Sequence, residues 1–352
     1  MNSQVRSTGW QSAALLLFLG LASSGLTLSG CSKAPAPLVH FGGQTMGTFY
    51  EVTFAPPSDE VDPASLQQLI DELLAAINKE MSTYDPTSEI SKFNESQDTE
   101  WFEVSPRFAQ VVYHSLQICE LTEGAFDPTV GPLVDLWHFG SKIEDRTIPT
   151  EEQIQATLEN CGYQSLEVRA DPPALRKTKP GLRLDLSAVA KGFAVDEVSR
   201  LLSAQGVKNH LVNIGGEIVA RGWRGPDQRW RLAIEKPRQE RETIQLKIEV
   251  TSTAMATSGN YRNFYEIDGV RYAHTINPAT GYPVQHELLS ATVLTEDCMT
   301  ADALATAMMV MGTERAEAFL YEHLLAGYLI SERDGELQTS ASPIFAELAG
   351  EQ

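Results

Sequence analysis

The sequence predicts an α+β fold: a single domain in which an antiparallel or mixed sheet is packed by helices. Two observations support this. The 352-residue chain is 42% hydrophobic and 21% charged, which is ordinary for a globular protein with a substantial core. Segments with strand-like alternation also come in runs and do not alternate strictly with helices, which favours antiparallel pairing. We find no internal repeat and no block of like charge.

The first thirty residues have the layout of a lipoprotein signal peptide. Arg6 gives a positive start, an apolar stretch follows, and Leu28-Ser29-Gly30-Cys31 resembles a bacterial lipobox. Cys31 is therefore the expected lipidation site. The alternative is a transmembrane anchor, but the apolar run is short for a membrane span. Residues 31–41 are then the lipidated Cys and a flexible tether rich in Pro and Ala, and residues 42–345 are the folded domain.

Charge and cysteine content exclude several classes of protein. The net charge is −20, and loss of residues 1–30, with one basic residue and no acid, makes it −21. Such an acidic chain is not expected to bind nucleic acid or to present a polybasic membrane face. Beyond Cys31, the chain has Cys119, Cys161 and Cys298, and no CxxC pair. A redox or zinc site is therefore not expected, and at most one disulfide could form.

Periodicity predicts five main helices. The clearest begins at the N-cap Asp62, has Pro63 in its first turn, and carries an apolar stripe to Met81. The others are expected from Ser105 to about Thr122, from Lys191 to about Gly206, from Thr300 to Met311 and from Glu314 to His323. Strands are expected over these ranges: 42–54, 182–186, 210–218, 230–235, 244–250, 254–257, 270–276, 289–294, 328–331 and 337–340.

Short polar segments stand out between these elements. They combine Gly, Ser, Thr, Asn and Asp in ways that a core does not need: QTMGT from 44, MSTYDP from 81, GAFDPTVGP from 124, DLSAVAKG from 185, NIGGE from 213, TSGNYR from 257, HTINPATG from 274 and TADALATA from 300. Taken singly each is weak evidence, because such residues are also ordinary turn and cap chemistry.

Asp302 and Thr306 carry more information. They lie four residues apart, so they share a face of the predicted helix, and the rest of that face is Ala and Met. A buried carboxylate needs a partner, and a hard cation with oxygen ligands is one possibility. The alternative is that Asp302 caps the helix while Thr306 bonds back to a carbonyl. These residues alone leave both readings open.

In order and spacing, the segments together resemble the FAD:protein FMN transferases, also called flavin transferases or ApbE proteins. The DLSAVAKG, HTINPATG and ADALATA segments are the most specific, and the resemblance runs from Thr45 to about Gly312. It implies a single α+β domain that binds FAD in a cleft, with Mg²⁺ against the diphosphate. It also implies transfer of FMN to a Thr or Ser hydroxyl of a target protein, with release of AMP.

The resemblance also assigns residues. It implies a metal site made by Asp302, Thr306 and the backbone carbonyl of Ala188. Some relatives have a second Asp where this chain has Ala305, so a second metal ion is in doubt. The positions that match FAD contacts are Met46, Tyr84, Ala125, Phe126, Asp127, Asp185, Lys191 and Ile276.

Phosphoryl transfer places charge on phosphate oxygens, so cations stabilise its transition state. Lys191 is a catalytic candidate for this reason, and Arg262 is a second helper, inferred from its Gly-Asn-Tyr-Arg turn. His274 is the candidate base, because it alone of the seven His lies in a motif. A turn-stabilising hydrogen bond is the alternative role for His274, and Asp185 could serve as the base instead.

The resemblance implies that the partners are FAD and flavin-carrying subunits of ion-pumping redox complexes. The lipid anchor implies the periplasmic face of a bacterial membrane, with the inner membrane favoured, although Ser32 after the lipidated Cys favours the outer membrane in some bacteria. Two other functions remain open. With water as acceptor the same site would be an FAD pyrophosphatase, and without catalysis the chain would be a flavin-binding lipoprotein, against which Asp302, Thr306 and Lys191 argue.

Overall fold

A computed structural model describes residues 37–57, 61–140, 147–237, 243–261 and 263–350. Cys31 and Arg262 therefore lie outside the described residues. An eight-stranded sheet, in the order β1-β2-β6-β7-β10-β13-β14-β15, has every neighbouring pair antiparallel. The predicted α+β class with an antiparallel sheet is confirmed. The strands are β1 Val39–Thr45, β2 Thr48–Phe54, β6 His210–Ile214, β7 Glu217–Arg221, β10 Thr253–Gly259, β13 Leu288–Thr295, β14 Ala326–Arg333 and β15 Glu336–Ala341.

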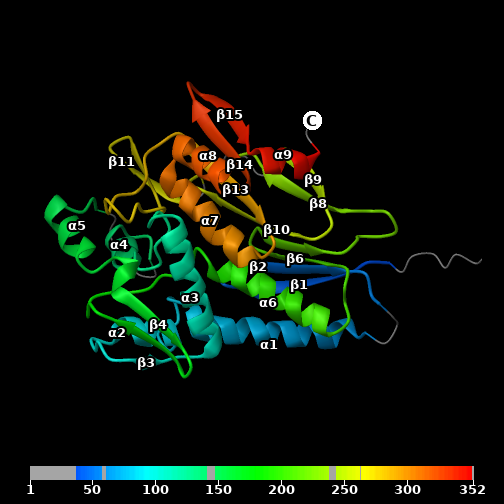
Figure 1. Cartoon of the computed structure of the whole chain (residues 1–352), viewed down its shortest axis with the longest axis horizontal. Helices are drawn as coiled ribbons and strands as arrows, with labels where there is room; N and C mark the ends of the chain where they lie inside the picture. The colour runs from blue at the N-terminus through cyan, green and yellow to red at the C-terminus, as the bar shows by residue number, and fades with distance from the viewer. Residues whose placement is uncertain (1–36, 58–60, 141–146, 238–242, 262, 351–352) are drawn as a thin grey trace, which may run out of the picture. The chain divides into compact units, whose positions relative to one another are not determined.

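Three long helices cover one face of this sheet (Figure 1). Helix α1 (Pro63–Met81) packs on β1, α6 (Ala190–Ala204) on β6 and β7, and α7 (Cys298–Met311) on β10 and β13. Helix α1 begins as expected, because the Asp62 carboxylate accepts hydrogen bonds from two first-turn amides. Its buried stripe points at the sheet, and α6 lies between α1 and α7.

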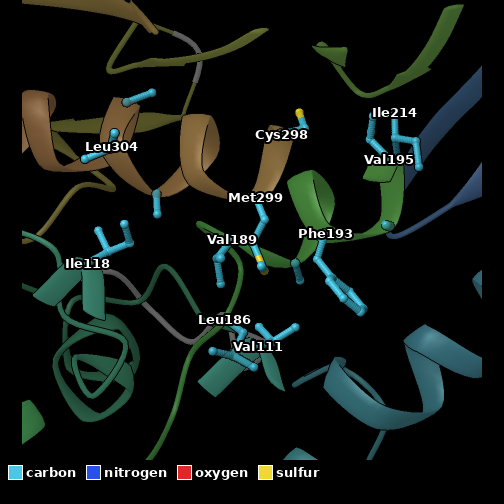
Figure 2. Close-up of a cluster of buried hydrophobic side chains, with 14 of the residues drawn as sticks. Val111, Ile118, Leu186, Val189, Phe193, Val195, Ile214, Cys298, Met299 and Leu304 are labelled. Atoms are coloured by element: carbon cyan, nitrogen blue, oxygen red, sulfur yellow. The ribbon is translucent and has the colours of Figure 1, made fainter. Parts of the chain in front are cut away.

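The core of the domain lies where α6 and α7 meet α3 (Pro106–Leu121). Figure 2 shows Val189 and Phe193 beside α6, Met299 and Leu304 on α7, and Ile118 on α3 converging on one apolar cluster. All five are less than a tenth exposed, and full burial of each large side chain contributes about 1.5–3 kcal/mol. This packing fixes the position of both helices relative to the sheet.

Smaller layers complete the domain. The opposite sheet face is covered by the hairpin of β8 (Trp230–Glu235) and β9 (Ile244–Val250) and by α9 (Pro343–Ala349), which share a second apolar cluster. A third cluster surrounds Trp137 between α4 (Gly131–Leu136) and α5 (Glu151–Leu158). The remaining elements are α2 Glu89–Glu95, α8 Thr313–Glu322, β3 Phe102–Glu103, β4 Leu166–Ala170, β5 Pro173–Lys177, β11 Phe264–Ile267, β12 Val270–Ala273 and the 3₁₀ turn Tyr163–Ser165.

Two of the predicted single strands are hairpins. The strand expected over 42–54 is split into β1 and β2 by a two-residue turn at Met46 and Gly47, which have φ of 49° and 70°. The strand expected over 210–218 is split into β6 and β7 by Gly215 and Gly216, again with positive φ. Because β1 starts at Val39, the last residues of the predicted tether belong to the sheet.

The strand predicted over 182–186 is wrong. Leu182, Leu184 and Leu186 are buried, which explains the alternation, but the segment is a loop across the core. The side chain of Asn94 accepts from the Leu184 amide at 2.7 Å and donates to its carbonyl at 2.8 Å. This amide takes the place of a neighbouring strand, which no periodicity argument could anticipate.

The other predicted elements are confirmed within a few residues, apart from the strand over 270–276, which ends at Ala273. The three described cysteines, Cys119, Cys161 and Cys298, are buried free thiols. Within the described residues, no helix combines the length and apolarity that a membrane crossing needs.

Candidate functional site

A cleft of about 420 Å³ lies beside the first turn of α6 and one face of α7. A second hollow of about 690 Å³, the groove, adjoins it and shares Tyr84, Asp185 and Lys191 in its wall. Met46 lines the groove. The structure thus brings together every described residue that the sequence singled out. Those lining the cleft are Tyr84, Ala125, Phe126, Asp127, Asp185, Ala188, Lys191, His274, Ile276, Asp302 and Thr306.

Asp302 does not cap its helix. The N-cap of α7 is Asp297, whose side chain accepts from the Thr300 amide. Asp302 lies one turn further in, is only 3% exposed, and accepts one hydrogen bond, from the Gly192 amide of α6 at 3.0 Å. Burial raises the pKa of Asp302, although Lys191 and the Gly192 amide oppose the shift. The carboxylate is therefore held by α6 at the cleft wall.

Thr306 lies one turn beyond Asp302 on the same face, as its spacing predicted. Its hydroxyl is 3.0 Å from the hydroxyl of Ser258 on β10, and among the described residues it makes no bond back to a helix carbonyl. The side chain therefore offers a hydroxyl oxygen to the cleft. Both parts of the alternative reading of Asp302 and Thr306, a cap and a back-bonded threonine, are excluded by these contacts.

Lys191 forms an ion pair that the sequence analysis did not anticipate. Its Nζ lies 2.6 Å from Oε1 of Glu217, the first residue of β7. Burial lowers the pKa of Lys191, but Asp302 and Glu217 outweigh it and raise the pKa above its ordinary value. The ammonium is therefore retained. The sequence marks the NIGGE segment as unusual, but it is the hairpin at Gly215 and Gly216 that places Glu217 in the cleft.

The charges of this cluster fit a divalent cation. Two nearly buried carboxylates, Asp302 and Glu217, are balanced by one ammonium, that of Lys191. Oε2 of Glu217 is buried and has no hydrogen-bond partner in the described structure. Asp302, the hydroxyl of Thr306 and the carbonyl of Ala188 are hard oxygen donors, which suit Mg²⁺. The described residues contain no cluster of three or more His, Cys, Asp or Glu that could hold a metal ion by themselves.

His274 is held with one ring nitrogen available. Its Nδ1 lies 3.2 Å from the Asn263 carbonyl oxygen, which can only accept, so Nδ1 carries the proton and Nε2 has a lone pair. Burial lowers the pKa of His274, with a smaller contribution from Lys191, while the Asn263 bond and Asp185 oppose the shift. The imidazole is therefore neutral at pH 7. The hydrogen bond to Asn263 is of the turn-stabilising kind that was the alternative role for His274. It uses only Nδ1, so Nε2 can still act as a base.

Asp127 organises the wall opposite α7. Oδ1 accepts from the amide and hydroxyl of Thr129, at 2.8 and 2.6 Å, and Oδ2 accepts from the Tyr163 amide at 3.0 Å. The neighbouring Ala125 and Phe126 are buried and line the cleft. Because its carboxylate is fully engaged, Asp127 shapes this wall through the loop that it holds.

Asp185 and Tyr84 lie where the cleft and the groove meet. Oδ1 of Asp185 accepts from the Ser187 amide at 2.8 Å, and its own amide donates to the Pro128 carbonyl. Tyr84 is 71% exposed, so its ring stands at the mouth. The carboxylate is thus fixed by its own turn, whereas the ring is free to meet a ligand.

Comparisons with known proteins identify the family of this chain. Residues 46–329 match the ApbE family. A FAD:protein FMN transferase of Vibrio cholerae is 43% identical over 91% of this chain and 95% of that protein. One from Escherichia coli K12 is 37% identical over 93% of this chain and 95% of that protein.

Solved structures show the same fold. The flavin transferase ApbE of Vibrio cholerae superimposes with a TM-score of 0.83 at 42% identity, covering 89% of this chain and all of that one. The apo flavinyl transferase ApbE of Pseudomonas stutzeri has a TM-score of 0.83 at 33% identity, covering 89% of this chain and 97% of that one. On its sequence and its fold, this chain belongs to the ApbE family.

Proposed function

We propose that this protein transfers FMN from FAD to a Thr or Ser hydroxyl of an acceptor protein and releases AMP, with Mg²⁺ as the metal. One observation carries the proposal: Lys191, His274, Asp302 and Thr306 come from distant parts of the chain and line one cleft. The curated relatives in Vibrio cholerae and Escherichia coli are named for FMN transfer from FAD to protein, which supports it.

The cleft can support this reaction as follows. The acceptor oxygen bonds to the FMN-side phosphorus while the bond from that phosphorus to the oxygen of AMP breaks. Mg²⁺ held by Asp302, Thr306 and the Ala188 carbonyl would supply Lewis-acid stabilisation of the phosphate charge. Lys191 adds a fixed ammonium at the same wall, and Nε2 of His274 is free to take the hydroxyl proton.

The remaining predicted residues suit the two ends of FAD. The buried wall made by Ala125, Phe126 and Ile276 offers an apolar surface to one ring system. Met46 and Tyr84, in the groove, offer a second one. A dinucleotide bound across both hollows would place its diphosphate at the wall that they share, which includes Lys191 and Asp185.

The test is a transfer assay with the purified protein, FAD, MgCl₂ and a candidate acceptor. We expect a fluorescent acceptor band, an acceptor mass increased by one FMN, and one AMP released per acceptor modified. EDTA should abolish all three, and His274→Gln should reduce the rate by about 10²-fold or more. AMP and free FMN without labelled acceptor would instead identify an FAD pyrophosphatase, and tight FAD binding without AMP would identify a binding protein.

We also propose that Cys31 is lipidated and holds the enzyme at the periplasmic face of the inner membrane, where its acceptors are flavin-carrying subunits of ion-pumping redox complexes. The lipobox sequence Leu28-Ser29-Gly30-Cys31 supports a lipid anchor. Cys31→Ala should move the protein from the membrane pellet to the soluble fraction and prevent labelling by palmitate. Membrane retention without label would contradict the anchor.

A further inference from the structure

Glu217 is the one charged group of the cleft wall to which neither the sequence motifs nor the proposed reaction gives a role. It is 3% exposed, it lines the cleft, and Oε1 lies 2.6 Å from Nζ of Lys191. Oε2 is buried without a partner in the described structure. A buried oxygen without a hydrogen-bond partner is destabilising, so packing alone does not account for a carboxylate here.

The backbone around Glu217 restricts where its side chain can lie. Gly215 and Gly216 have φ of 65° and 111°, and the tight turn that they form pairs Ile214 with Glu217 across the hairpin. The Glu217 side chain thus leaves from the end of a paired strand in the middle of the sheet. Lys191 is different, because its ammonium sits on a long flexible chain in the first turn of α6.

We propose that Glu217 is a positioning residue for the transfer reaction: it anchors the Lys191 ammonium at the junction of the cleft and the groove. Fixing the long side chain of a lysine costs rotamer entropy. The ion pair meets that cost before substrate binds, so the ammonium is already in place when charge develops on the phosphate.

This role differs from that of a metal ligand or a base. Glu217 acts through Lys191, so its removal should matter only while Lys191 is present. The inference rests on the proposed function, because the rate it concerns is that of FMN transfer. Glu217→Gln keeps the shape of the side chain and removes its charge, whereas Glu217→Asp keeps the charge on a shorter stem.

A double-mutant cycle tests the proposal with Glu217→Gln, Lys191→Met and the double variant, assayed in full-length protein with FAD, MgCl₂ and acceptor. We expect Glu217→Gln to lower kcat about 10-fold to 100-fold, the range typical of residues that orient a functional group. The double variant should be no slower than Lys191→Met alone. The Kd for FAD, measured by flavin fluorescence quenching, should change less than 3-fold in Glu217→Gln, and Glu217→Asp should recover part of kcat.

The matched control is Glu80→Gln. Glu80 is also buried and paired with a cation, Arg107, at 2.5 Å, but it lines neither hollow. Its kcat should stay within 2-fold of the wild type, and circular dichroism should show all variants folded. Losses that multiply in the double variant, or an unchanged kcat in Glu217→Gln, would overturn the positioning role. Absence of transfer in the wild type would overturn the proposed function instead.

Discussion

Two buried aspartates join α6 to α7. Each lies within one helix and accepts hydrogen bonds from the first turn of the other. Asp196 on α6 accepts from the amides of Cys298 and Met299, both at 2.9 Å, so each of its oxygens has a partner in the first turn of α7. Asp302 on α7 accepts from Gly192 in the first turn of α6, and only through Oδ2. The two carboxylates are almost equally buried, at 4% and 3% exposure.

The two aspartates differ in how many of their carboxylate oxygens accept a hydrogen bond. Asp196 completes the hydrogen bonding of a helix N-terminus, where a carboxylate is most stable. Asp302 receives a single bond among the described residues and lines the cleft. Similar burial and the same residue type therefore give one carboxylate with both oxygens bonded and one with an oxygen left for the proposed metal ion. The two aspartates differ in the number of hydrogen-bond donors that the fold supplies to each. Substituting each aspartate tests whether this difference separates a structural role from a functional one.

The largest expected effect belongs to Asp302→Asn. The amide oxygen can still accept from Gly192, but the negative charge is lost. We expect transfer to fall by about 10²–10³-fold, as for loss of a group that stabilises transition-state charge. The free energy of unfolding should change by less than about 1 kcal/mol, because a charge disfavoured by burial is removed. Rates at saturating Mg²⁺ and guanidinium unfolding measure both. Transfer at the full rate would show that Asp302 holds no metal.

Asp196→Ala should show the opposite pattern. Two buried amides of α7 lose their acceptor, and we expect a loss of about 2–4 kcal/mol in the free energy of unfolding. Transfer per folded molecule should stay within a few-fold of the wild type, since Asp196 does not line the cleft. Denaturant unfolding and an assay well below the melting temperature separate the two quantities. A strong loss of rate without loss of stability would erase the distinction between the two aspartates.

Gly192→Ala should affect both contacts at once. A Cβ at this position would lie 2.3 Å from the Cys298 carbonyl oxygen and 2.9 Å from the Asp302 side chain, so α6 and α7 would have to separate. Overpacking of this kind costs about 1–3 kcal/mol. We expect lower stability by thermal unfolding together with a reduced transfer rate. A variant with unchanged rate and stability would show that the close approach of the helices is not needed.

The last expected effect is a pH dependence of stability. Burial raises the pKa of Asp196 to about 6, with Asp297 acting in the same direction and the Cys298 and Met299 amides and Arg200 opposing it. The folded state therefore binds this proton more tightly than the unfolded chain, whose pKa is near 3.8. The contribution is complete below about pH 4 and is lost as pH rises through about 6.

Each pKa unit corresponds to about 1.4 kcal/mol, so a shift of about two units should make the wild type lose about 2–3 kcal/mol from this group between pH 4 and pH 7. Asp196→Ala should lack that component, and the stability difference between the two proteins should narrow as pH rises. Urea titrations at several pH values measure it. A difference that is constant across this range would contradict the raised pKa.

Sequence reasoning predicted the composition of the cleft better than its internal contacts. Helical spacing placed Asp302 and Thr306 on one face, and the resemblance to the flavin transferases assigned them, with the loop residues, to one site. The ion pair between Lys191 and Glu217 could not be predicted from the sequence, since Glu217 reaches the cleft only through the turn at Gly215 and Gly216. Contacts of this kind depend on how separate elements cross.

The elements of the fold divide in the same way: those with local sequence signals were predicted, and those that depend on contacts between distant residues were not. Helices with a cap and an apolar stripe, such as α1, were placed almost to the residue, because their signals are local. The loop over 182–186 was mistaken for a strand, because burial alternates there while Asn94 supplies the hydrogen bonds. The turn at Met46 and Gly47 was missed, because only one of its two positive-φ residues is a glycine.

The bond between Gly192 and Asp302 joins residues 110 positions apart, and it has a consequence for how the chain matures. During synthesis, Asp185 and the first turn of α6 with Lys191 leave the ribosome well before α7 does. A nascent chain ending before Cys298 lacks the carboxylate of the proposed metal site and leaves the central strand β10 without its covering helix. Activity should therefore be acquired in a single late step, so a truncated product would be inert and not partially active.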